Sequence, residues 1–192
     1  MSKEDSSFIT RLTLTLLIIC AVCVGLVAYA HSATKDVIAA RAAADVKAAY
    51  KQVFPELGEL SKEKAPGGLI TDIQCSKKGG KANGYIYTVE PTGYGGKLTI
   101  MVGIDQKNKL TGIKILKLSE TPGLGMKSTE PTWQAQFKGK PLKDELVVTK
   151  QDPTKDNDVR AITAATITSR AVVKGLNEVR AHYMKTYANG KG

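Results

Sequence analysis

Apolar residues along this chain follow patterns that predict its elements. From Leu12 to Ala30, 19 consecutive positions carry no charged side chain, which is long enough for a helix to span a bilayer. A signal peptide is the alternative, because residues 28–30 read Ala-Tyr-Ala and resemble a cleavage site. The run exceeds the roughly 7–15 apolar residues of a signal-peptide core, so the pattern favours a retained membrane anchor.

Two other segments place apolar residues at helical spacing. Residues 31–55 are rich in alanine, and we predict a stalk helix there, capped by Thr34 and ended by Pro55. Residues 172–187 predict an amphipathic C-terminal helix, in which Gly175 would mark a close contact and His182 would face solvent. The apolar positions of this helix are Val172, Leu176, Val179, Tyr183 and Tyr187.

Between these helices the pattern changes to the period of a strand. Residues 97–104 alternate strictly between polar or small and apolar side chains, which predicts a strand with one buried face. Residues 106–108 then form a turn into a hairpin partner, Leu110–Leu118. Further strands are expected at 70–74, 84–89 and 145–150, and loops at 61–68 and 151–158.

A short helix is expected just after the hairpin. Ser128 or Thr129 would cap it, and it would carry Trp133 and Phe137 one turn apart. Aromatic pairs at this spacing are more often part of a core than of a site that stacks on a ligand.

Together these elements predict an α+β fold. A tail at 1–11 precedes a transmembrane helix at 12–30, and residues 31–192 form one domain that begins with the stalk helix at 31–55. This domain contains an antiparallel sheet and is closed by the C-terminal helix.

Composition narrows the function classes. The net charge of +10 comes from lysines spread along the chain, without the clustered basic and aromatic residues that nucleic-acid binding requires, so we expect no nucleic acid. A basic surface of this kind suits anionic lipid or an acidic partner protein. Cys20 and Cys23 lie within the apolar run and Cys75 stands alone, which predicts neither a disulfide framework nor a metal site.

Two short segments carry the candidate chemistry. Residues 120–125, Glu-Thr-Pro-Gly-Leu-Gly, contain Pro and Gly in the order of a type II turn, and a tight turn alone would explain them. Residues 162–169, Ile-Thr-Ala-Ala-Thr-Ile-Thr-Ser, place four hydroxyls at the start of the C-terminal helix. A helix N-terminus offers free N–H groups to a phosphate, and the alternative is that one hydroxyl simply caps it.

Both segments resemble those of a known family. Residues 158–172 are similar to the flavinylation motif of the FMN-binding domain family, with Ala164 where the family usually has Gly. Ser119–Gly125 resembles the Ser-Glu-Thr-Pro-Gly-Leu-Gly loop in the G subunit of Rnf-type ion-translocating ferredoxin–NAD oxidoreductases and in its Nqr relative. If the motif requires a positive φ at position 164, alanine is unfavourable there.

The resemblance implies an electron carrier with covalent FMN. Thr166 would hold FMN through a phosphoester bond made by a separate flavin transferase, and the other cofactor-binding residues would be Thr163, Ala164, Ala165, Thr168, Ser169, Glu120, Thr121, Gly123, Leu124 and Gly125. No catalytic residue and no metal are expected. The domain would lie outside the cytoplasm, on a single-pass anchor in the cell membrane, beside other membrane subunits of an Rnf-type complex.

Other functions stay open from sequence. One is the related C subunit of a Na⁺-pumping NADH–quinone reductase, or another reductase built on an FMN domain. Another is a basic, membrane-anchored scaffold module without redox chemistry. Basic residues are about balanced on the two sides of the anchor, so charge does not set its orientation.

Overall fold

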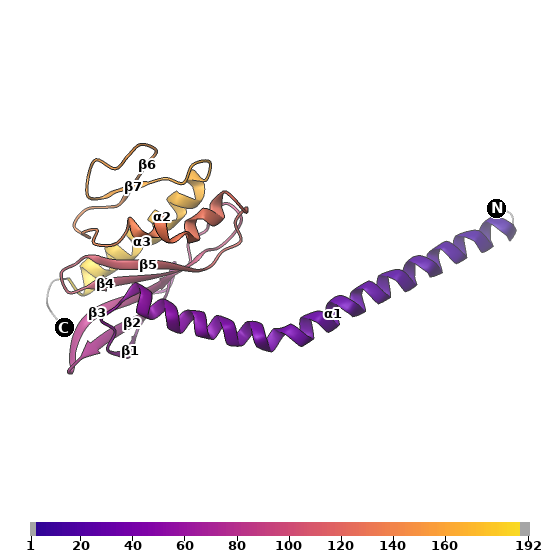
Figure 1. Cartoon of the computed structure of the whole chain (residues 1–192), viewed down its shortest axis with the longest axis horizontal. Coiled ribbons are helices and arrows are strands. Elements are labelled where there is room, and N and C mark those ends of the chain that lie inside the picture. Colours follow the sequence, from indigo (N-terminus) through magenta and orange to yellow (C-terminus); the bar gives the residue numbers. More distant parts are fainter. Residues whose placement is uncertain (1–2, 189–192) are drawn as a thin grey trace. The chain divides into compact units, whose positions relative to one another are not determined.

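A single long helix opens the chain. The computed structural model describes residues 3–188, except for the side chains of residues 3–7, 39 and 43. Helix α1 runs from Lys3 to Val53 without interruption, so the predicted anchor and stalk are one helix (Figure 1). The prediction that Thr34 caps a second helix is wrong, because its hydroxyl donates to the Ala30 carbonyl at 2.8 Å, a mid-helix bond. Pro55 follows the helix end closely, as predicted.

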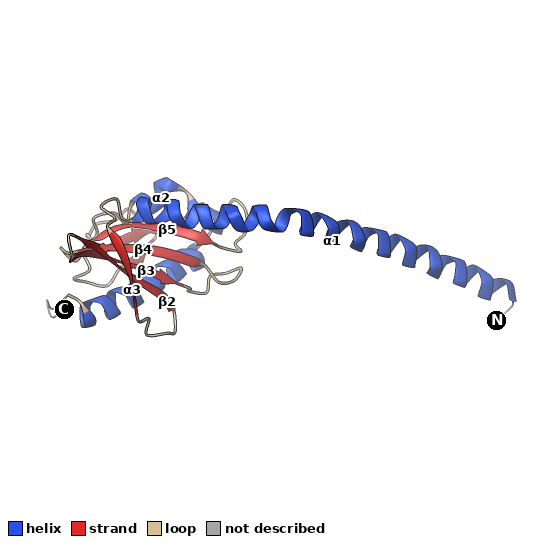
Figure 2. Cartoon of the chain, turned by 90° about the horizontal axis from the view of Figure 1, so that it is seen from below, coloured by secondary structure: helices blue, strands red, loops and turns tan. Residues whose placement is uncertain are grey.

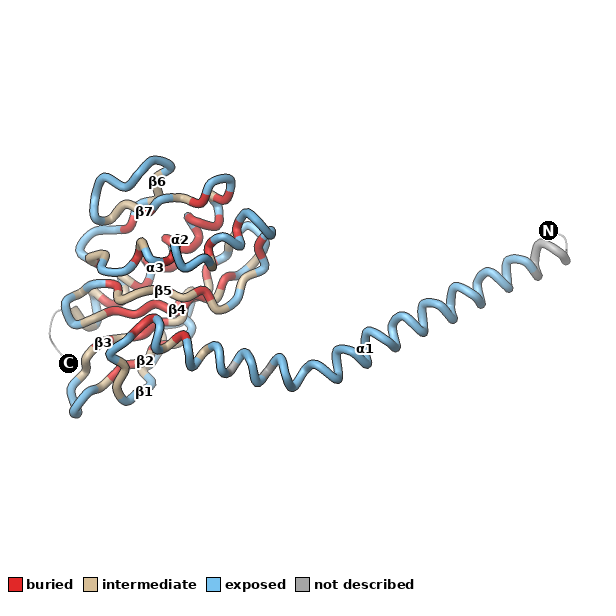
Figure 3. The backbone as a smooth tube through the Cα atoms, in the orientation of Figure 1, coloured by how far each residue is buried: buried red, intermediate tan, exposed pale blue. Residues whose placement is uncertain are grey.

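Two compact units share α1. The first extends to Ala44, and the second begins at Asp45 and contains everything that follows. Within the described residues, α1 is the one helix long and apolar enough to cross a membrane, judged by length and composition. Residues 8–38 are exposed, as the colouring of the tube in Figure 3 shows. Leucine, isoleucine and valine left in water over such a length would be unfavourable, which is consistent with a helix surrounded by lipid.

A five-stranded antiparallel sheet forms the centre of the second unit. Its order is β1-β2-β3-β4-β5, so each strand pairs with its neighbour in sequence. The strands are β1 (Glu59–Glu63), β2 (Ile70–Lys78), β3 (Lys81–Val89), β4 (Thr99–Asp105) and β5 (Leu110–Lys117). The predicted hairpin is confirmed, with Val102 paired to Ile113. β1 lies in a segment predicted to be a loop, because its charged residues resemble a loop sequence but also suit an exposed edge strand.

Both faces of the sheet are covered, which corrects the prediction of one buried face for β4. Ile100, Val102 and Ile104 pack beneath α3 (Thr166–Thr186), while Met101 on the opposite face packs with Val53 and Phe54 at the end of α1. Figure 2 shows the end of α1 and α3 on the two sides of the sheet. Gly103 and Gly112 lie side by side under Val53 and leave room for this approach. The close approach of Gly175 in α3 is confirmed, since a Cβ there would lie 3.1 Å from Pro91.

The remaining elements connect the sheet to α3. They are the 3₁₀ helix η1 (Gly125–Thr129), α2 (Pro131–Ala135), and the parallel strands β6 (Val147–Thr149) and β7 (Asp158–Arg160). Ser128 and Thr129 do not cap α2, because both hydroxyls donate back into η1. Phe137 is fully buried, and its ring meets Trp133 edge-on at 5.1 Å, so the pair belongs to the core as predicted.

Candidate functional site

The two segments singled out in the sequence meet around one cavity. Its volume is about 490 Å³, within the range of small-ligand sites. The turn at 120–125 forms one wall and the start of α3 forms the other, although they are more than 40 residues apart in sequence. The lining residues are Tyr94, Glu120, Thr121, Leu124, Gly125, Ala164, Ala165, Thr166, Ile167 and Thr168.

The turn has the geometry that its sequence predicts. Gly123 has φ +76°, and the N–H of Leu124 donates to the Thr121 carbonyl at 3.2 Å, as in a type II turn. The turn presents Leu124, 41% exposed, at the cavity, while Gly123 does not line it.

Glu120 joins the walls of the cavity to a third segment. Its side chain is 8% exposed. Oε1 accepts hydrogen bonds from the backbone N–H groups of Tyr94 and Gly95, at 2.9 and 3.3 Å. Oε2 accepts one from the hydroxyl of Thr168, in the first turn of α3, at 2.9 Å. One buried carboxylate therefore fixes the glycine-rich segment 93–96 and the start of α3 relative to the turn.

Glycines make room for this carboxylate. A Cβ on Gly93 would collide with Oε1 of Glu120, and a Cβ on Gly125 would collide with Oε2 and lie 2.9 Å from the Thr168 hydroxyl oxygen. A Cβ on Gly95 would collide with the carbonyl of Ser119. These collisions explain why glycines lie on both sides of the site, since a larger side chain there would displace Glu120 from its hydrogen-bond partners.

The four hydroxyls before and within α3 have different environments. Ser169 is fully buried, donates to the Ala165 carbonyl at 3.0 Å and accepts from the Ile162 N–H at 2.9 Å. Thr168 is committed to Glu120, and Thr163 is exposed outside the cavity. Thr166 is half-buried and lines the cavity, and within residues 3–188 its hydroxyl makes no hydrogen bond.

The start of α3 is open to a ligand. Ala165 occupies the N-cap position, and no side chain caps the first turn in the described part of the chain. The simple interpretation of the hydroxyls as caps is therefore wrong, because Thr168 and Ser169 lie inside the helix and bond elsewhere. The free N–H groups of this turn and the helix dipole favour an anion.

Ala164 adopts the left-handed conformation in which alanine, unlike glycine, is unfavourable. Its φ is +62°, a region that glycine occupies readily and alanine does not. The loop therefore has the shape that glycine would give it, and the alanine is accommodated with backbone strain.

Tyr94 and Ile167 are lining residues that sequence reasoning did not assign. Tyr94 is 72% exposed and Ile167 is 56% exposed, so together with Leu124 they form an apolar rim around the cavity. In the sequence, the one feature that could have indicated them is their position next to other site residues. Tyr94 lies within the glycine-rich segment 93–96, and Ile167 follows Thr166.

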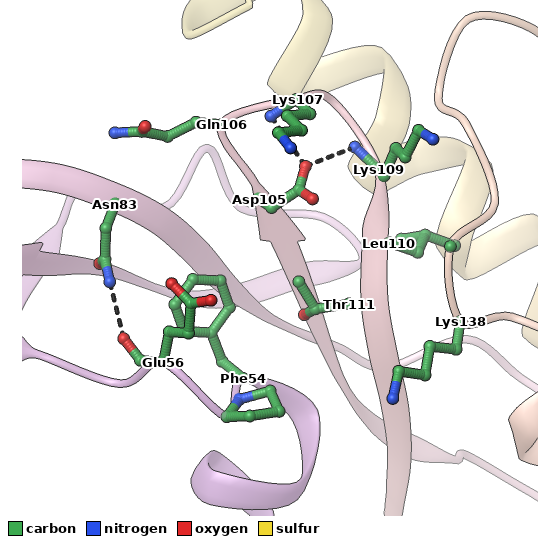
Figure 4. Close-up of a pocket in the computed structure, with 12 residues that line it drawn as sticks. Phe54, Glu56, Asn83, Asp105, Gln106, Lys107, Lys109, Leu110, Thr111 and Lys138 are labelled. Carbon is green, nitrogen blue, oxygen red and sulfur yellow. Dashed lines mark hydrogen bonds between the residues drawn. The ribbon is translucent and has the colours of Figure 1, made fainter.

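A second cavity, of about 430 Å³, lies where the end of α1 meets the β4–β5 turn (Figure 4). Three lysines line it, namely Lys107, Lys109 and Lys138, and Figure 4 shows the Asp105 carboxylate accepting from the backbone of the first two. None of the residues predicted to bind a cofactor lines this cavity.

In residues 3–188 no group of His, Cys, Asp or Glu side chains comes together to hold a metal ion.

An aromatic cluster lies toward the other end of α3. The rings of Tyr85 and Tyr187 stack at 4.0 Å, and burial raises the pKa of Tyr85 to about 12. The prediction that His182 faces solvent is wrong, since its Nδ1 lies 3.1 Å from the Tyr87 hydroxyl. Burial lowers the pKa of His182, and the nearby Lys185 lowers it further.

Comparison with known proteins identifies the family. The chain is 32% identical over 184 residues to the G subunit of an ion-translocating oxidoreductase complex from Methanosarcina acetivorans, covering 91% of this chain and 94% of that one. This chain belongs to the RnfG family, the G subunits of ion-translocating oxidoreductase complexes. The family region named RnfG N-terminal region matches residues 1–53, and the FMN-binding domain matches residues 93–181. The domain match contains both walls of the cavity.

Two further proteins extend the comparison. The chain is 42% identical over 139 residues to the G subunit of a Na(+)-translocating ferredoxin:NAD(+) oxidoreductase complex from Acetobacterium woodii. That match covers 70% of this chain and 65% of the relative, so it spans just under two thirds of the relative's length. Among solved structures, the C subunit of the Na(+)-translocating NADH-quinone reductase from Parabacteroides distasonis superposes with a TM-score of 0.54 at 26% identity, covering 63% of this chain and 64% of that one. The resemblance noted in the sequence is thereby confirmed, and so is the α+β fold.

Proposed function

We propose that this protein carries FMN on Thr166 through a phosphoester bond and relays electrons within a membrane-bound, ion-translocating oxidoreductase complex. The observation that carries the proposal is the state of the four hydroxyls. Thr166 is the one among them that both lines the cavity and has no hydrogen bond in the described residues. It is therefore the hydroxyl available for modification.

The residues of the cavity fit such a group. The uncapped first turn of α3 would face the phosphate, where N–H groups and the helix dipole offset its charge. The apolar rim of Tyr94, Leu124 and Ile167 offers surfaces for a planar ring. A bound flavin would supply the electron-transfer chemistry, while the chain positions it and sets its electrostatic surroundings.

We infer that attachment needs a separate enzyme, because Glu120 is the one carboxylate among the cavity residues and its Oε2 already accepts from the Thr168 hydroxyl. In the proposed reaction a flavin transferase uses FAD. The bond from Thr166 Oγ1 to phosphorus forms, the pyrophosphate bond of FAD breaks, AMP leaves and the hydroxyl proton is released. A covalent tether keeps the cofactor at high local concentration without a deep pocket.

The remaining parts of the proposal concern partners and location. The names of the relatives assign them to ferredoxin:NAD(+) and ion-translocating oxidoreductase complexes, so we infer that other membrane subunits donate electrons to this domain and accept them from it. A cofactor attached covalently suits a domain outside the cytoplasm, where free FMN is scarce. The protein alone is expected to show no turnover, since no substrate-activating group lines the cavity.

Intact mass tests the attachment. We expect the full chain, produced in a host that supplies the transferase, to weigh about 438 Da more than its amino acids, the mass of one esterified FMN. Thr166→Ala should remove this excess and the in-gel flavin fluorescence after denaturation. Thr163→Ala is the matched control, because Thr163 is an exposed neighbour outside the cavity and should leave both signals intact.

The result also separates the function classes. A wild-type chain without added mass or yellow colour would contradict the electron-relay proposal and favour a non-redox scaffold. Fluorescence retained in Thr166→Ala would exclude Thr166 as the attachment point. Yellow colour without added mass would indicate FMN held without a covalent bond and would contradict the phosphoester at Thr166.

A further inference from the structure

Glu120 brings a negative charge to the wall of the proposed flavin cavity. It is the one charged residue among those that line the cavity. None of the ion pairs formed in residues 3–188 includes it, and its three partners are two backbone N–H groups and one hydroxyl. Hydrogen bonds from these neutral donors hold the carboxylate in place but leave its charge uncompensated by a cation.

Burial makes this charge more effective than the many charges on the surface. The chain carries a net charge of +10, but its lysines are mostly exposed, and solvent and salt screen exposed charges strongly beyond a Debye length of about 10 Å. Glu120 is 8% exposed and lines the cavity, so it would lie next to a group bound there. In these surroundings the effective dielectric constant is lower than in water, and a charge acts more strongly on its neighbours.

We infer that Glu120 lowers the reduction potential of the flavin bound in this cavity, in addition to joining the cavity walls. This inference rests on the proposed function, because it requires a flavin at the site. When one electron enters the flavin from an external donor, the flavin gains one unit of negative charge beside the carboxylate. Repulsion between the two charges disfavours the reduced form, so the site would favour giving the electron onward to the next carrier.

The rigid mounting of Glu120 is part of this inference. The side chain cannot turn away from an added negative charge without losing its bonds to Tyr94, Gly95 and Thr168. Gly93 and Gly125 lie against the carboxylate, where a Cβ on either residue would collide with one of its oxygens. The charge is therefore fixed rather than free to relax into solvent, which preserves its electrostatic effect.

The decisive measurement is a spectroelectrochemical titration of the flavin-loaded full chain in detergent. Glu120→Gln keeps the shape of the side chain and one of its two acceptor oxygens, which can still accept from the Tyr94 and Gly95 N–H groups, while its amide NH2 can donate to the Thr168 hydroxyl and the charge is removed. Glu130→Gln is the matched control, since Glu130 is exposed and does not line the cavity. We expect Glu120→Gln to favour reduction at least about tenfold, a positive shift of about 59 mV for a one-electron couple, while Glu130→Gln stays close to wild type.

Each outcome bears on the inference separately from the proposed function. A wild type without flavin would overturn the proposed function and this inference with it. A loaded Glu120→Gln variant with the same midpoint potential as Glu130→Gln would overturn the inference alone. If Glu120→Gln does not take up flavin, Ile167→Lys and Ile167→Gln are compared instead, because Ile167 lies on the exposed rim of the same cavity. A cation there should offset Glu120 and raise the potential, and equal potentials for this pair would overturn the inference.

Discussion

Replacing Ala164 with glycine should stabilise the protein. Ala164 is exposed and has φ +62°, a conformation that costs an L-residue with a Cβ about 1–2 kcal/mol. Glycine removes this cost but adds backbone entropy to the unfolded state, which takes back about 0.4–1 kcal/mol. The net gain in unfolding free energy is thus about 0–1.6 kcal/mol, with a midpoint of about 0.8 kcal/mol. For a domain of about 150 residues this midpoint corresponds to a rise in Tm of about 2–3 °C.

Trp133 gives a suitable probe for this variant. It is the single tryptophan, and its Nε1 donates to the Arg160 carbonyl at 2.9 Å, just before the strained loop. Urea unfolding of the full chain in detergent, followed by Trp133 fluorescence, should show a higher midpoint with an unchanged slope for Ala164→Gly. Ala165→Gly is the control, because Ala165 is buried with φ −131° and should be destabilised. A loss of stability in both variants would refute the reasoning from the φ angle.

Two further perturbations test the site and the distal cluster. Gly125→Ala should lower the unfolding free energy by about 1–3 kcal/mol, measured by urea titration, and should reduce flavin loading, because its Cβ would collide with Glu120. The His182 pKa is lowered in the folded state, so the unfolded chain binds the proton more readily, and stability should decrease as the pH falls through about 6.5 and below. His182→Gln should lose this part of the pH dependence in unfolding measurements between pH 5 and about 7.5, and an unchanged profile would contradict the role assigned to burial.

Periodicity predicted the positions of the hairpin strands and of α3, and in β5 and α3 the apolar positions do lie on one buried face. It was wrong for β4, where Met101 and Gly103 looked like solvent-facing positions. Both are covered by the last turn of α1, which comes from about 50 residues earlier in the chain. Alternation cannot report such cover, since glycine and methionine give little sign of whether a helix lies over them.

Strands β1 and β7 were missed for a related reason. Each is short, contains charged residues and obtains its hydrogen bonds from one partner strand. Their residues have little intrinsic preference for a strand, so tertiary pairing decides their conformation. The turn at 120–125 was the opposite case, because Pro122 and Gly123 fix the backbone locally and the predicted geometry followed.

The candidate site combines both situations. Its segments could be found from sequence because each has local turn or helix-start chemistry, whereas the residue that joins them could be assigned only as one more cofactor contact. The link between Glu120 and Thr168 spans 48 positions and depends on three glycines that permit the approach.

The dependence of the cavity on Glu120 has a consequence for how the protein matures. The walls of the cavity come from the turn after β5, the segment before β4 and the start of α3, which assemble only when the sheet and α3 have packed. In an extended chain Thr166 lacks the hydrogen bonds that Glu120 makes between the cavity walls, the uncapped start of α3 and the apolar rim. We therefore expect attachment to follow folding rather than precede it. Gly125→Ala retains the Thr166 hydroxyl but disturbs the hydrogen bonds of Glu120, so it should lose flavin in proportion to its loss of structure. If the transferase instead recognised the motif as linear sequence, wild type and Gly125→Ala would be loaded equally well.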